Sequence, residues 1–301
     1  LTRQREAIQV ERAKFDHLLL RHAQDSGAEV REGWTIARFS SEASGIGVEA
    51  RSDAGEAQTF HGAFLIDASG RGNVTGNQEG LRVIHPRLRK LAVFGHFRGV
   101  KLSPGERGGD TVIVRLANKW FWLIPLETDK VSVGCVMDKD EFAQSRAPID
   151  KLFWRIVQSS PPMRERMEHA RLVNEIQTTT DFSYYNKRFV SRRLLRGGDA
   201  AGFMDPIFSA GVYLAMYSAK LAAEAVDTSL RCGDDGARRF RTYEKKVRRA
   251  MEVYFHMVHH FYTTPFMEVF LEPRPKWDLP AAVNAVLAGE TKGGWSFWWR
   301  L

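Results

Sequence analysis

Cysteine and long apolar runs are scarce in this chain of 301 residues. Its two cysteines, Cys135 and Cys232, lie far apart and form no Cys-x-x-Cys or Cys/His cluster, which argues against a metal site and agrees with a reducing cytoplasm. No apolar run approaches the ~18 residues of a transmembrane helix. Residues 1–10 also lack the apolar centre of a signal peptide. We therefore expect a cytoplasmic protein without stable membrane insertion.

A Gly-x-Gly-x-x-Gly fingerprint between a strand and a helix is absent as well. In dinucleotide-binding proteins this fingerprint cradles the pyrophosphate in the first βαβ unit. The chain begins at Leu1, without a methionine, directly in a charged segment. We therefore expect the sequence to be a piece of a longer protein.

The chain is basic, with a formal net charge of +8 at pH 7. Basic residues cluster within residues 82–90, 192–196 and 238–249, but no nucleic-acid-binding motif accompanies them. The last cluster also holds Glu244, which is typical of a solvated helix face. We expect no nucleic-acid partner, and an acidic protein partner fits the charge better.

A turn with glycine and aspartate organises the chain. A predicted strand over residues 187–195 leads into Gly198-Asp199, and a helix is predicted to begin near Ser209. Gly198 allows a close backbone approach, Asp199 can accept hydrogen bonds from hydroxyls, and Pro206 stiffens the chain before the helix. Free N–H groups at a helix start suit an anion. A capped helix after a glycine-rich turn, without any ligand, explains the same residues.

Two segments near the start of the chain show related patterns. Residues 63–67 are apolar, which is typical of a strand buried on both faces, and they end in Asp67, with Gly70 following. Such strand ends bind ligands in open α/β sheets, although a simple turn at the aspartate explains the pattern equally well. Residues 12–25 predict a helix that begins at Arg12, and a short strand is expected over residues 28–31.

Alternating patterns predict the remaining sheets. In one predicted strand Trp120, Trp122 and Ile124 share a face, and Pro125 is expected to end the strand. Other strands are expected over residues 35–39, 46–50, 58–61, 91–98, 110–116, 119–126, 130–137 and 175–184, and helices over residues 148–158, 162–170, 209–230 and 235–262. His256 and His260 lie four residues apart, but without a His-Glu-x-x-His arrangement they are expected to pack rather than bind metal.

Two of these strings resemble signatures of the flavin-dependent halogenases, a family of FAD-dependent monooxygenases. Gly198-Asp199-Ala-Ala, followed by Asp205-Pro-Ile-Phe-Ser-Ala-Gly-Val212, is similar to the second FAD-binding motif in its halogenase form. Trp120-Phe-Trp-Leu-Ile-Pro125 is similar to the Trp-x-Trp-x-Ile-Pro signature. Both strings stand in the order that the family has.

The resemblance implies an α/β (α+β) fold of the glutathione-reductase-like and aromatic-hydroxylase-like FAD-binding class. It would have a mixed or antiparallel substrate sheet and C-terminal helices, with the first βαβ unit missing. FAD contacts are implied at Arg12, Asp67, Gly70, Gly198, Asp199, Pro206, Gly211 and Val212. A halide site is implied at Ser209, Ala210 and Gly211, and a position near the flavin for Trp120, Trp122 and Pro125. The catalytic lysine of the family lies in the missing part, so none is assigned.

The implied reaction uses FAD reduced by a separate flavin reductase, oxygen and a halide ion to halogenate an electron-rich aromatic substrate. Phe208 stands where tryptophan halogenases carry a glutamate, which favours a phenol or pyrrole, free or bound to an acyl or peptidyl carrier protein. Ala210 replaces the usual Ser or Thr and leaves halide use open. A flavin hydroxylase or epoxidase, a reductase of prenyl double bonds, and a basic binding module without redox chemistry stay as alternatives.

Four segments are expected. Residues 1–80 would belong to the FAD-binding domain, residues 81–190 to an antiparallel-sheet substrate domain, residues 191–230 to a returning FAD-binding segment, and residues 231–301 to a C-terminal helical region. Without the first βαβ unit, we expect this chain alone not to bind FAD tightly.

Overall fold

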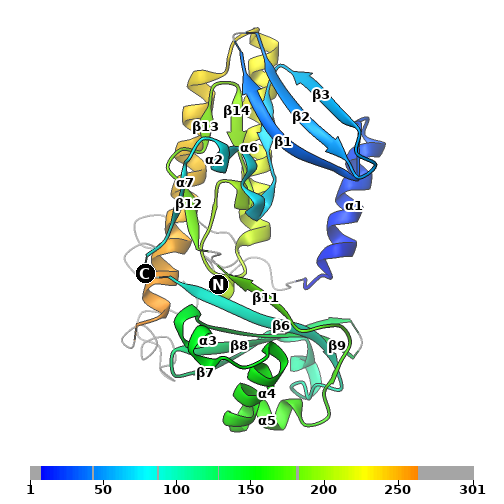
Figure 1. The fold of residues 1–301 in the computed structure, drawn as a ribbon, viewed down its shortest axis with the longest axis vertical. Helices are drawn as coiled ribbons and strands as arrows, with labels where there is room; N and C mark the ends of the chain where they lie inside the picture. Colours follow the sequence, from blue (N-terminus) through cyan, green and yellow to red (C-terminus); the bar gives the residue numbers. More distant parts are fainter. Residues whose placement is uncertain (1–7, 43, 87, 128, 181–182, 264–301) are drawn as a thin grey trace. The chain divides into compact units, whose positions relative to one another are not determined.

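The computed structural model describes residues 8–263 except residues 43, 87, 128, 181 and 182. The part of the C-terminal helical region expected beyond residue 263 therefore lies outside the described residues. Contacts divide the chain into two compact units (Figure 1). The described part of the first unit is residues 31–85 and 183–263, and that of the second is residues 8–30 and 86–180.

The first unit begins with an antiparallel meander of β1 (Trp34–Ser41), β2 (Ile46–Ser52) and β3 (Ala57–Gly62). Glycine-containing turns join the three strands, as the alternating pattern predicts. Residues 28–31 form no strand, so that prediction is wrong. This short segment has no ladder partner among the described residues, and four alternating residues alone do not form a stable strand.

A small parallel pair follows, formed by β4 (Leu65–Asp67) and β14 (Leu194–Arg196), with β13 (Val190–Ser191) on the outer side of β14. The prediction that residues 63–67 are buried on both faces is wrong: Ile66 is 40% exposed, so the face of β4 on which it lies is not fully covered. The single strand expected over residues 187–195 is a hairpin instead. Arg193 adopts a left-handed conformation (φ 57°) and reverses the chain between β13 and β14.

Short elements connect these strands to two long helices. They are the sheet of β5 (Arg82–Ile84), β12 (Tyr184–Asn186) and β15 (Gly202–Phe203), the helix α2 (Val74–Gln78), and the 3-10 turns η1 (Gly70–Gly72), η3 (Gly198–Ala200) and η4 (Pro206–Phe208). Helix α6 (Gly211–Cys232) ends at left-handed Gly233, and α7 (Ala237–Phe261) packs against α6. Leu195, Leu214 and Tyr243 belong to their shared core.

The second unit is built on one antiparallel sheet, which confirms the expected class of sheet. Its order is β10 (Arg171–Leu172), β6 (Lys90–Arg98), β9 (Lys130–Asp138), β8 (Lys119–Glu127) and β7 (Val112–Leu116), and β11 (Gln177–Thr180) also pairs with β6. The predicted 175–184 strand is thus split, since only β11 joins this sheet and β12 pairs with β5. Helix α1 (Arg12–Asp25) belongs to this unit and has the predicted bounds.

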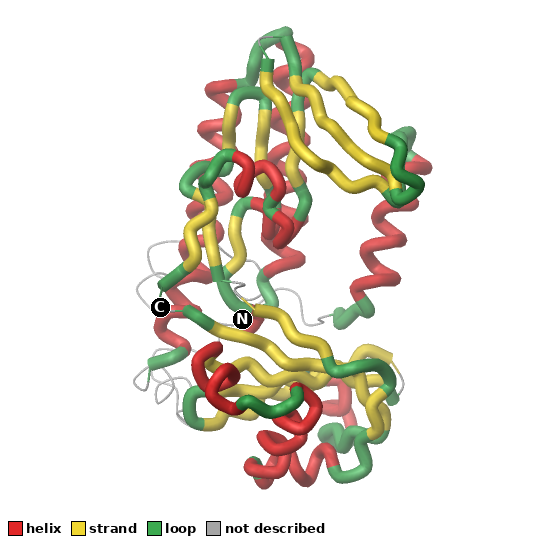
Figure 2. The backbone as a smooth tube through the Cα atoms, in the orientation of Figure 1, coloured by secondary structure: helices red, strands yellow, loops and turns green. Residues whose placement is uncertain are grey.

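Helices α4 (Ile149–Ser159) and α5 (Pro161–Met167) cover one face of this sheet (Figure 2). Phe97 of β6 and Phe121 of β8 pack against Phe153 of α4 in the core between them. Helix α3 (Lys139–Ser145) was not predicted, although Asp138 and the acidic residues after it are typical of a helix start.

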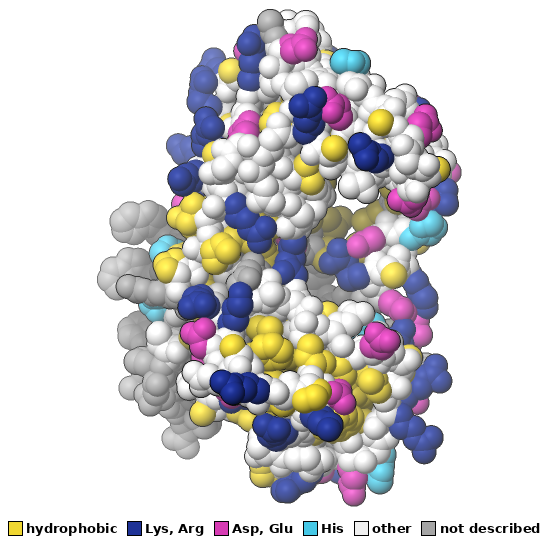
Figure 3. Space-filling model, viewed as in Figure 1, with side chains coloured by type: hydrophobic (Ala, Val, Ile, Leu, Met, Phe, Trp, Pro, Cys, Tyr) yellow, Lys and Arg dark blue, Asp and Glu magenta, His cyan; other side chains and the backbone are white. Residues whose placement is uncertain are grey.

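On the face in view, basic side chains are distributed over both units rather than gathered in one place (Figure 3). Across the residues that the structure describes, no helix combines the length and the apolar character that crossing a membrane requires.

Candidate functional site

The parallel strands β4 and β14 end side by side, with Asp67 opposite Arg196. Each strand continues directly into a tight turn, η1 after β4 and η3 after β14, and the two turns contact each other. Gly70 and Gly198 have φ angles of 59° and 54°, a conformation that favours glycine. The structure therefore brings Asp67, Gly70, Gly198 and Asp199 to one edge, at the carboxyl ends of parallel strands where α/β folds bind ligands.

Asp67 is buried and holds the first of these turns. One carboxylate oxygen accepts a hydrogen bond from the Ser69 amide at 2.8 Å, and the other accepts from the Thr75 amide at 3.0 Å and from the Thr75 hydroxyl. The Asp67 carbonyl accepts from the Gly197 amide at 2.9 Å, which joins the two strand ends. Asp67 thus shapes this edge, and its predicted contact with a cofactor stays a prediction.

Arg196, which was not singled out from the sequence, lies completely buried beneath the same edge. Its Nε donates to the Thr75 hydroxyl at 2.8 Å, and its guanidinium meets a carboxylate oxygen of Glu79 at 3.0 Å. Burial lowers the pKa of Arg196, while Glu79 counteracts that effect. A buried charge needs such partners, so this pair fixes α2 against β14.

Two buried asparagines add a second fixed connection. The side-chain amides of Asn73 and Asn186 exchange two hydrogen bonds, each 2.9 Å long, and Asn186 also donates to the Ala200 carbonyl at 2.9 Å. Gly76 makes room for this pair, since a Cβ there would lie 2.1 Å from the Asn73 side-chain oxygen. The network ties η1 and η3 to β12. Its partners lie 113 residues apart, so no local pattern signals them.

Gly198 packs against α6. Its amide donates to the Ser218 hydroxyl at 2.8 Å, and a Cβ on Gly198 would lie 3.2 Å from Ala215. The carbonyl of the next residue, Asp199, accepts from the Tyr184 hydroxyl at 2.6 Å. Burial raises the pKa of Tyr184 to about 12. The Gly-Asp turn is therefore positioned by contacts with both α6 and β12.

The helix start predicted near Ser209 lies two residues later, because Ser209 itself is left-handed (φ 51°) and exposed. Pro206 begins η4, Ala210 precedes α6, and Gly211 and Val212 are its first residues. No side chain caps this end. The first N–H groups of a helix have no partner within it, so the half-buried start of this long helix presents donors and a positive dipole end.

Two tyrosines, Tyr243 of α7 and Tyr262 just after it, form hydrogen bonds to the chain on either side of the Gly-Asp turn. The Tyr243 hydroxyl donates to the Arg196 carbonyl at 2.6 Å. The Tyr262 hydroxyl, one residue after α7, donates to a carboxylate oxygen of Asp205 at 2.8 Å, and the other oxygen accepts from the Ile207 amide at 3.0 Å.

In the second unit, Trp120 and Trp122 share a face of β8 as predicted, with ring centroids 5.8 Å apart. Trp120 is buried, whereas Trp122 is half-buried and donates from its indole nitrogen to the Ser132 hydroxyl at 3.1 Å. The prediction that Pro125 ends the strand is wrong, because β8 continues to Glu127. Pro125 lies beyond Leu123, the last residue of β8 that pairs with β7, so its missing N–H breaks no ladder on that side.

Arg12 also lies in the second unit, whereas Gly198 and Asp199 belong to the first. Its side chain is exposed and forms an ion pair with Asp16 at 2.8 Å, one turn along α1. Its predicted role in binding FAD stays a prediction. Among the described residues, no group of three or more His, Cys, Asp and Glu side chains could hold a metal ion.

Comparison with known proteins assigns the chain to a family. The Tryptophan halogenase family model matches residues 2–270. A tryptophan 2-halogenase of Chondromyces crocatus is 33% identical over 223 residues, 72% of this chain and 43% of that protein. A 1H-pyrrole-2-carbonyl-peptidyl-carrier-protein brominase of Pseudoalteromonas luteoviolacea (strain 2ta16) is 30% identical over 285 residues, 93% of this chain and 69% of that protein.

Solved structures agree with this assignment. The structure of the myxobacterial chondrochloren halogenase, described as a variant of the FAD-dependent halogenases, superposes with a TM-score of 0.82 at 29% identity. The superposition includes 97% of this chain and 70% of the chondrochloren halogenase chain. The α/β class with sheets and C-terminal helices is thereby confirmed. The chain spans only part of the length of its curated relatives. By its sequence and its fold, the chain belongs to the flavin-dependent tryptophan halogenase family.

Proposed function

We propose that the complete protein is an FAD-dependent halogenase acting on an electron-rich aromatic ring. The observation that carries this proposal is the edge formed by Asp67, Gly70, Gly198 and Asp199, together with the uncapped start of α6 in the same unit.

The residues present at this edge fit a flavin cofactor. A Cβ on Gly70 would meet no atom within 4 Å, so the first turn leaves space for a ligand beside its backbone. Residues Gly198, Asp199, Pro206, Gly211 and Val212 would hold FAD, with contributions from Asp67 and Gly70 of the same unit. When bound and reduced, FAD supplies the activation of oxygen that the family reaction requires.

The backbone of Ser209, Ala210 and Gly211 would hold the halide. Backbone N–H donors at a helix start attract anions whatever side chain they carry, so Ala210 is compatible with this role. Trp120 and Trp122 would form an apolar wall for the substrate ring and exclude water from it.

We further propose a phenol or a pyrrole as substrate, presented by an acidic acyl or peptidyl carrier protein in the pyrrole case, and reduced FAD from a separate flavin reductase. Phe208 and the identity to a brominase of a carrier-bound pyrrole support this choice. The identity to a tryptophan 2-halogenase supports free tryptophan as a second candidate. A cytoplasmic location, predicted from the two free cysteines, belongs to the same proposal.

The test is incubation of the full-length protein with FAD, a flavin reductase, oxygen and bromide or chloride. The substrates are phenols, pyrrole-2-carbonyl thioesters and free tryptophan. Mass spectrometry should show a halogenated phenol or pyrrole. A product that is hydroxylated but never halogenated would favour the hydroxylase alternative, and halogenated tryptophan alone would favour the second candidate. Failure of the full-length protein to bind FAD would refute every enzymatic assignment.

A further inference from the structure

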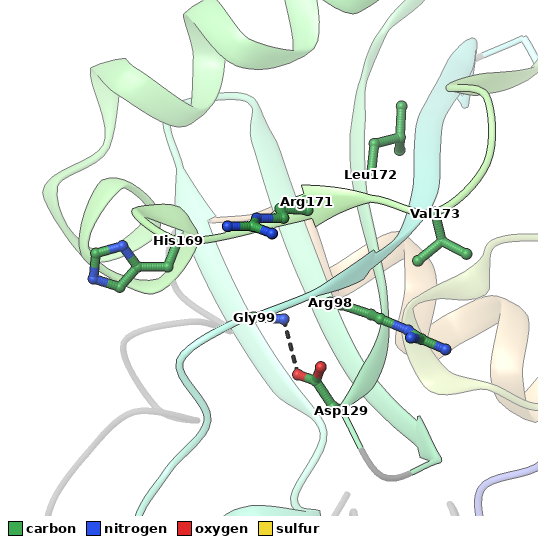
Figure 4. A pocket seen from close by; sticks show the side chains of 7 residues that line it. All are labelled: Arg98, Gly99, Asp129, His169, Arg171, Leu172 and Val173. Carbon is green, nitrogen blue, oxygen red and sulfur yellow. Dashed lines mark hydrogen bonds between the residues drawn. The ribbon is translucent and has the colours of Figure 1, made fainter.

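A hollow of about 670 Å³ lies at the outer strand pair of the second unit, β6 and β10. Its lining includes three basic side chains, Arg98, His169 and Arg171, and two apolar side chains, Leu172 and Val173. The apolar pair is 42% and 47% exposed. We call these five residues the β6–β10 patch (Figure 4).

Arg98 and Arg171 occupy directly opposite positions of the antiparallel strand pair. Like charges at such positions destabilise a sheet. Within the described residues, neither guanidinium has a hydrogen-bond or ion-pair partner. Asp129 also lines the hollow, but its carboxylate accepts a hydrogen bond from the Gly99 amide at 2.9 Å.

Lysines of the same sheet contrast with these arginines. Lys90, Lys119 and Lys130 each meet a carboxylate, of Asp138, Glu141 and Glu11, at 2.6–2.7 Å. The sheet therefore carries charge-compensated lysines, and beside them a pair of facing arginines that the fold does not compensate. The facing arginines add nothing to the stability of the fold, and their exposed guanidiniums are available to an external partner.

The shape of the patch indicates the kind of partner. The two guanidiniums extend in opposite directions, Arg171 toward His169 (Figure 4). Their charge is thus spread along the surface instead of converging on one small ion. Arginine next to an exposed aliphatic side chain, here Val173, is typical of a protein interface, and spread positive charge fits an acidic protein surface.

Arg98, Arg171 and Val173 of the patch lie on the same face of the sheet as Trp122, whereas Leu172 lies on the face that α4 covers. Side chains alternate along β6, so Phe94 and Arg98 lie on one face, and Phe94 contacts Trp122 with ring centroids 6.0 Å apart. Arg98 lies four residue steps along β6 from Phe94, which is ~13 Å at ~3.3 Å per step. A partner bound at Arg98 and Arg171 would therefore lie about four residues along β6 from the aromatic pair Phe94 and Trp122.

We propose that the β6–β10 patch docks an acidic carrier protein, whose tethered aromatic ring reaches Trp122 along the face of β6. This inference rests on the proposed function and adds to it the surface that recognises the partner. Arg98 and Arg171 attract and orient the carrier, and they take no part in the reaction itself.

The experiment uses the full-length enzyme with FAD, flavin reductase and bromide. One substrate is pyrrole-2-carboxylate loaded on an acidic peptidyl carrier domain, and the other is the same acyl group on N-acetylcysteamine, which has neither carrier nor phosphate. The variants are Arg98→Glu, Arg171→Glu, the double variant, and the neutral double variant with glutamine. The matched control is Arg164→Glu, an exposed arginine of α5, which covers the opposite face of the sheet.

For the double reversal we expect kcat/KM with the loaded carrier to fall at least 10-fold, mainly through KM, and to lose much of its salt dependence. The rate with the small thioester should stay within twofold of the wild type, and Arg164→Glu should match the wild type with both substrates. Each single reversal should raise Tm, because it turns a repulsive cross-strand pair into an attractive one. A single reversal that raises Tm and also lowers kcat/KM with the loaded carrier would show that the loss comes from docking and not from damage to the fold.

The inference is overturned if the double reversal uses the loaded carrier as well as the Arg164→Glu control does, or if it loses both substrates equally while the glutamine variant keeps both. A wild-type enzyme that halogenates the small thioester and ignores the loaded carrier would also overturn it, yet leave the proposed halogenase function intact. An enzyme that halogenates neither substrate nor any other aromatic ring would instead refute the proposed function.

Discussion

The indole of Trp122 lies directly over Gly134, its cross-strand neighbour on β9. A Cβ on Gly134 would stand only 2.1–2.5 Å from three carbons of the indole ring, so the ring occupies the place of a side chain. The contact and the hydrogen bond to Ser132 together fix the orientation of one of the two signature tryptophans. A lone glycine in a strand pattern often marks such a close approach.

Replacing Gly134 with alanine should therefore displace Trp122. We expect a loss of ~1–3 kcal/mol in the free energy of unfolding, as for other overpacked sites, together with a changed near-UV circular dichroism spectrum. In the full-length protein, less halogenated product should form per reduced FAD consumed. Gly109→Ala is the control, because a Cβ there meets no atom within 4 Å. Equal spectra and stabilities for the two variants would show that the ring does not depend on Gly134.

Replacing Arg196 with methionine leaves Glu79 and Thr75 without their buried partner. Breaking such a pair costs ~3–5 kcal/mol, and the lower end applies because Glu79 remains partly exposed. Urea unfolding measures the loss. Arg188→Met is the control, because Arg188 is exposed and lies 3.9 Å from the same Glu79 carboxylate. Its loss should cost less than ~0.5 kcal/mol in the free energy of unfolding. Similar losses for both variants would contradict the structural role of Arg196.

Alkaline pH should destabilise the first unit through Tyr184. Burial raises its pKa to about 12, above the ordinary value of 10.0, so the unfolded chain releases the phenol proton first. The contribution of this group to stability is complete below pH 10 and is lost as the pH rises from about 10 toward about 12.

Tyr184→Phe should lower stability by ~1 kcal/mol at pH 8, because the hydrogen bond to the Asp199 carbonyl is lost. It should also reduce the decline between pH 10 and pH 12, measured by urea unfolding at each pH. Tyr185→Phe, at the exposed neighbouring position, should change neither quantity. An unchanged alkaline decline in the Tyr184 variant would refute the assignment.

The two cysteines should differ in reactivity. Cys135 is completely buried in the core of the second unit, and burial raises the pKa of its thiol, whereas Cys232 is exposed at the end of α6. A thiol reagent at pH 8 should modify one thiol per native chain and two in denaturant, since only an exposed thiolate reacts readily. Cys232→Ser should abolish the native reaction, and a persistent reaction would contradict the burial of Cys135.

Much of the fold could be predicted because its signals are local. The four strands around Trp120, the helix over residues 12–25 and the glycine that ends α6 all follow from periodicity and capping within a few residues. The hairpin at Arg193 could not be predicted because its left-handed residue is an arginine, which is not a turn signal. The exposure of Ile66 could not be predicted because it depends on which segments pack over the face of β4.

The predicted site residues were the ones that signature strings mark, such as Gly198 and Asp199. The groups that hold them in place, among them Thr75, Asn73 and Asn186, come from distant parts of the chain and have no pattern of their own. Arg196 was next to the signature, yet only its complete burial reveals what it does.

The hydroxyls of Tyr243 and Tyr262 donate hydrogen bonds to Arg196 and Asp205, one on each side of the Gly198-Asp199 turn. Both come from one helix and the residue that follows it. A truncation or frameshift that removes the end of α7 would therefore leave every signature residue in place and still release the helix start. A gene carrying such a change would still match every signature string while encoding a protein in which the start of α6 is no longer held by Tyr262.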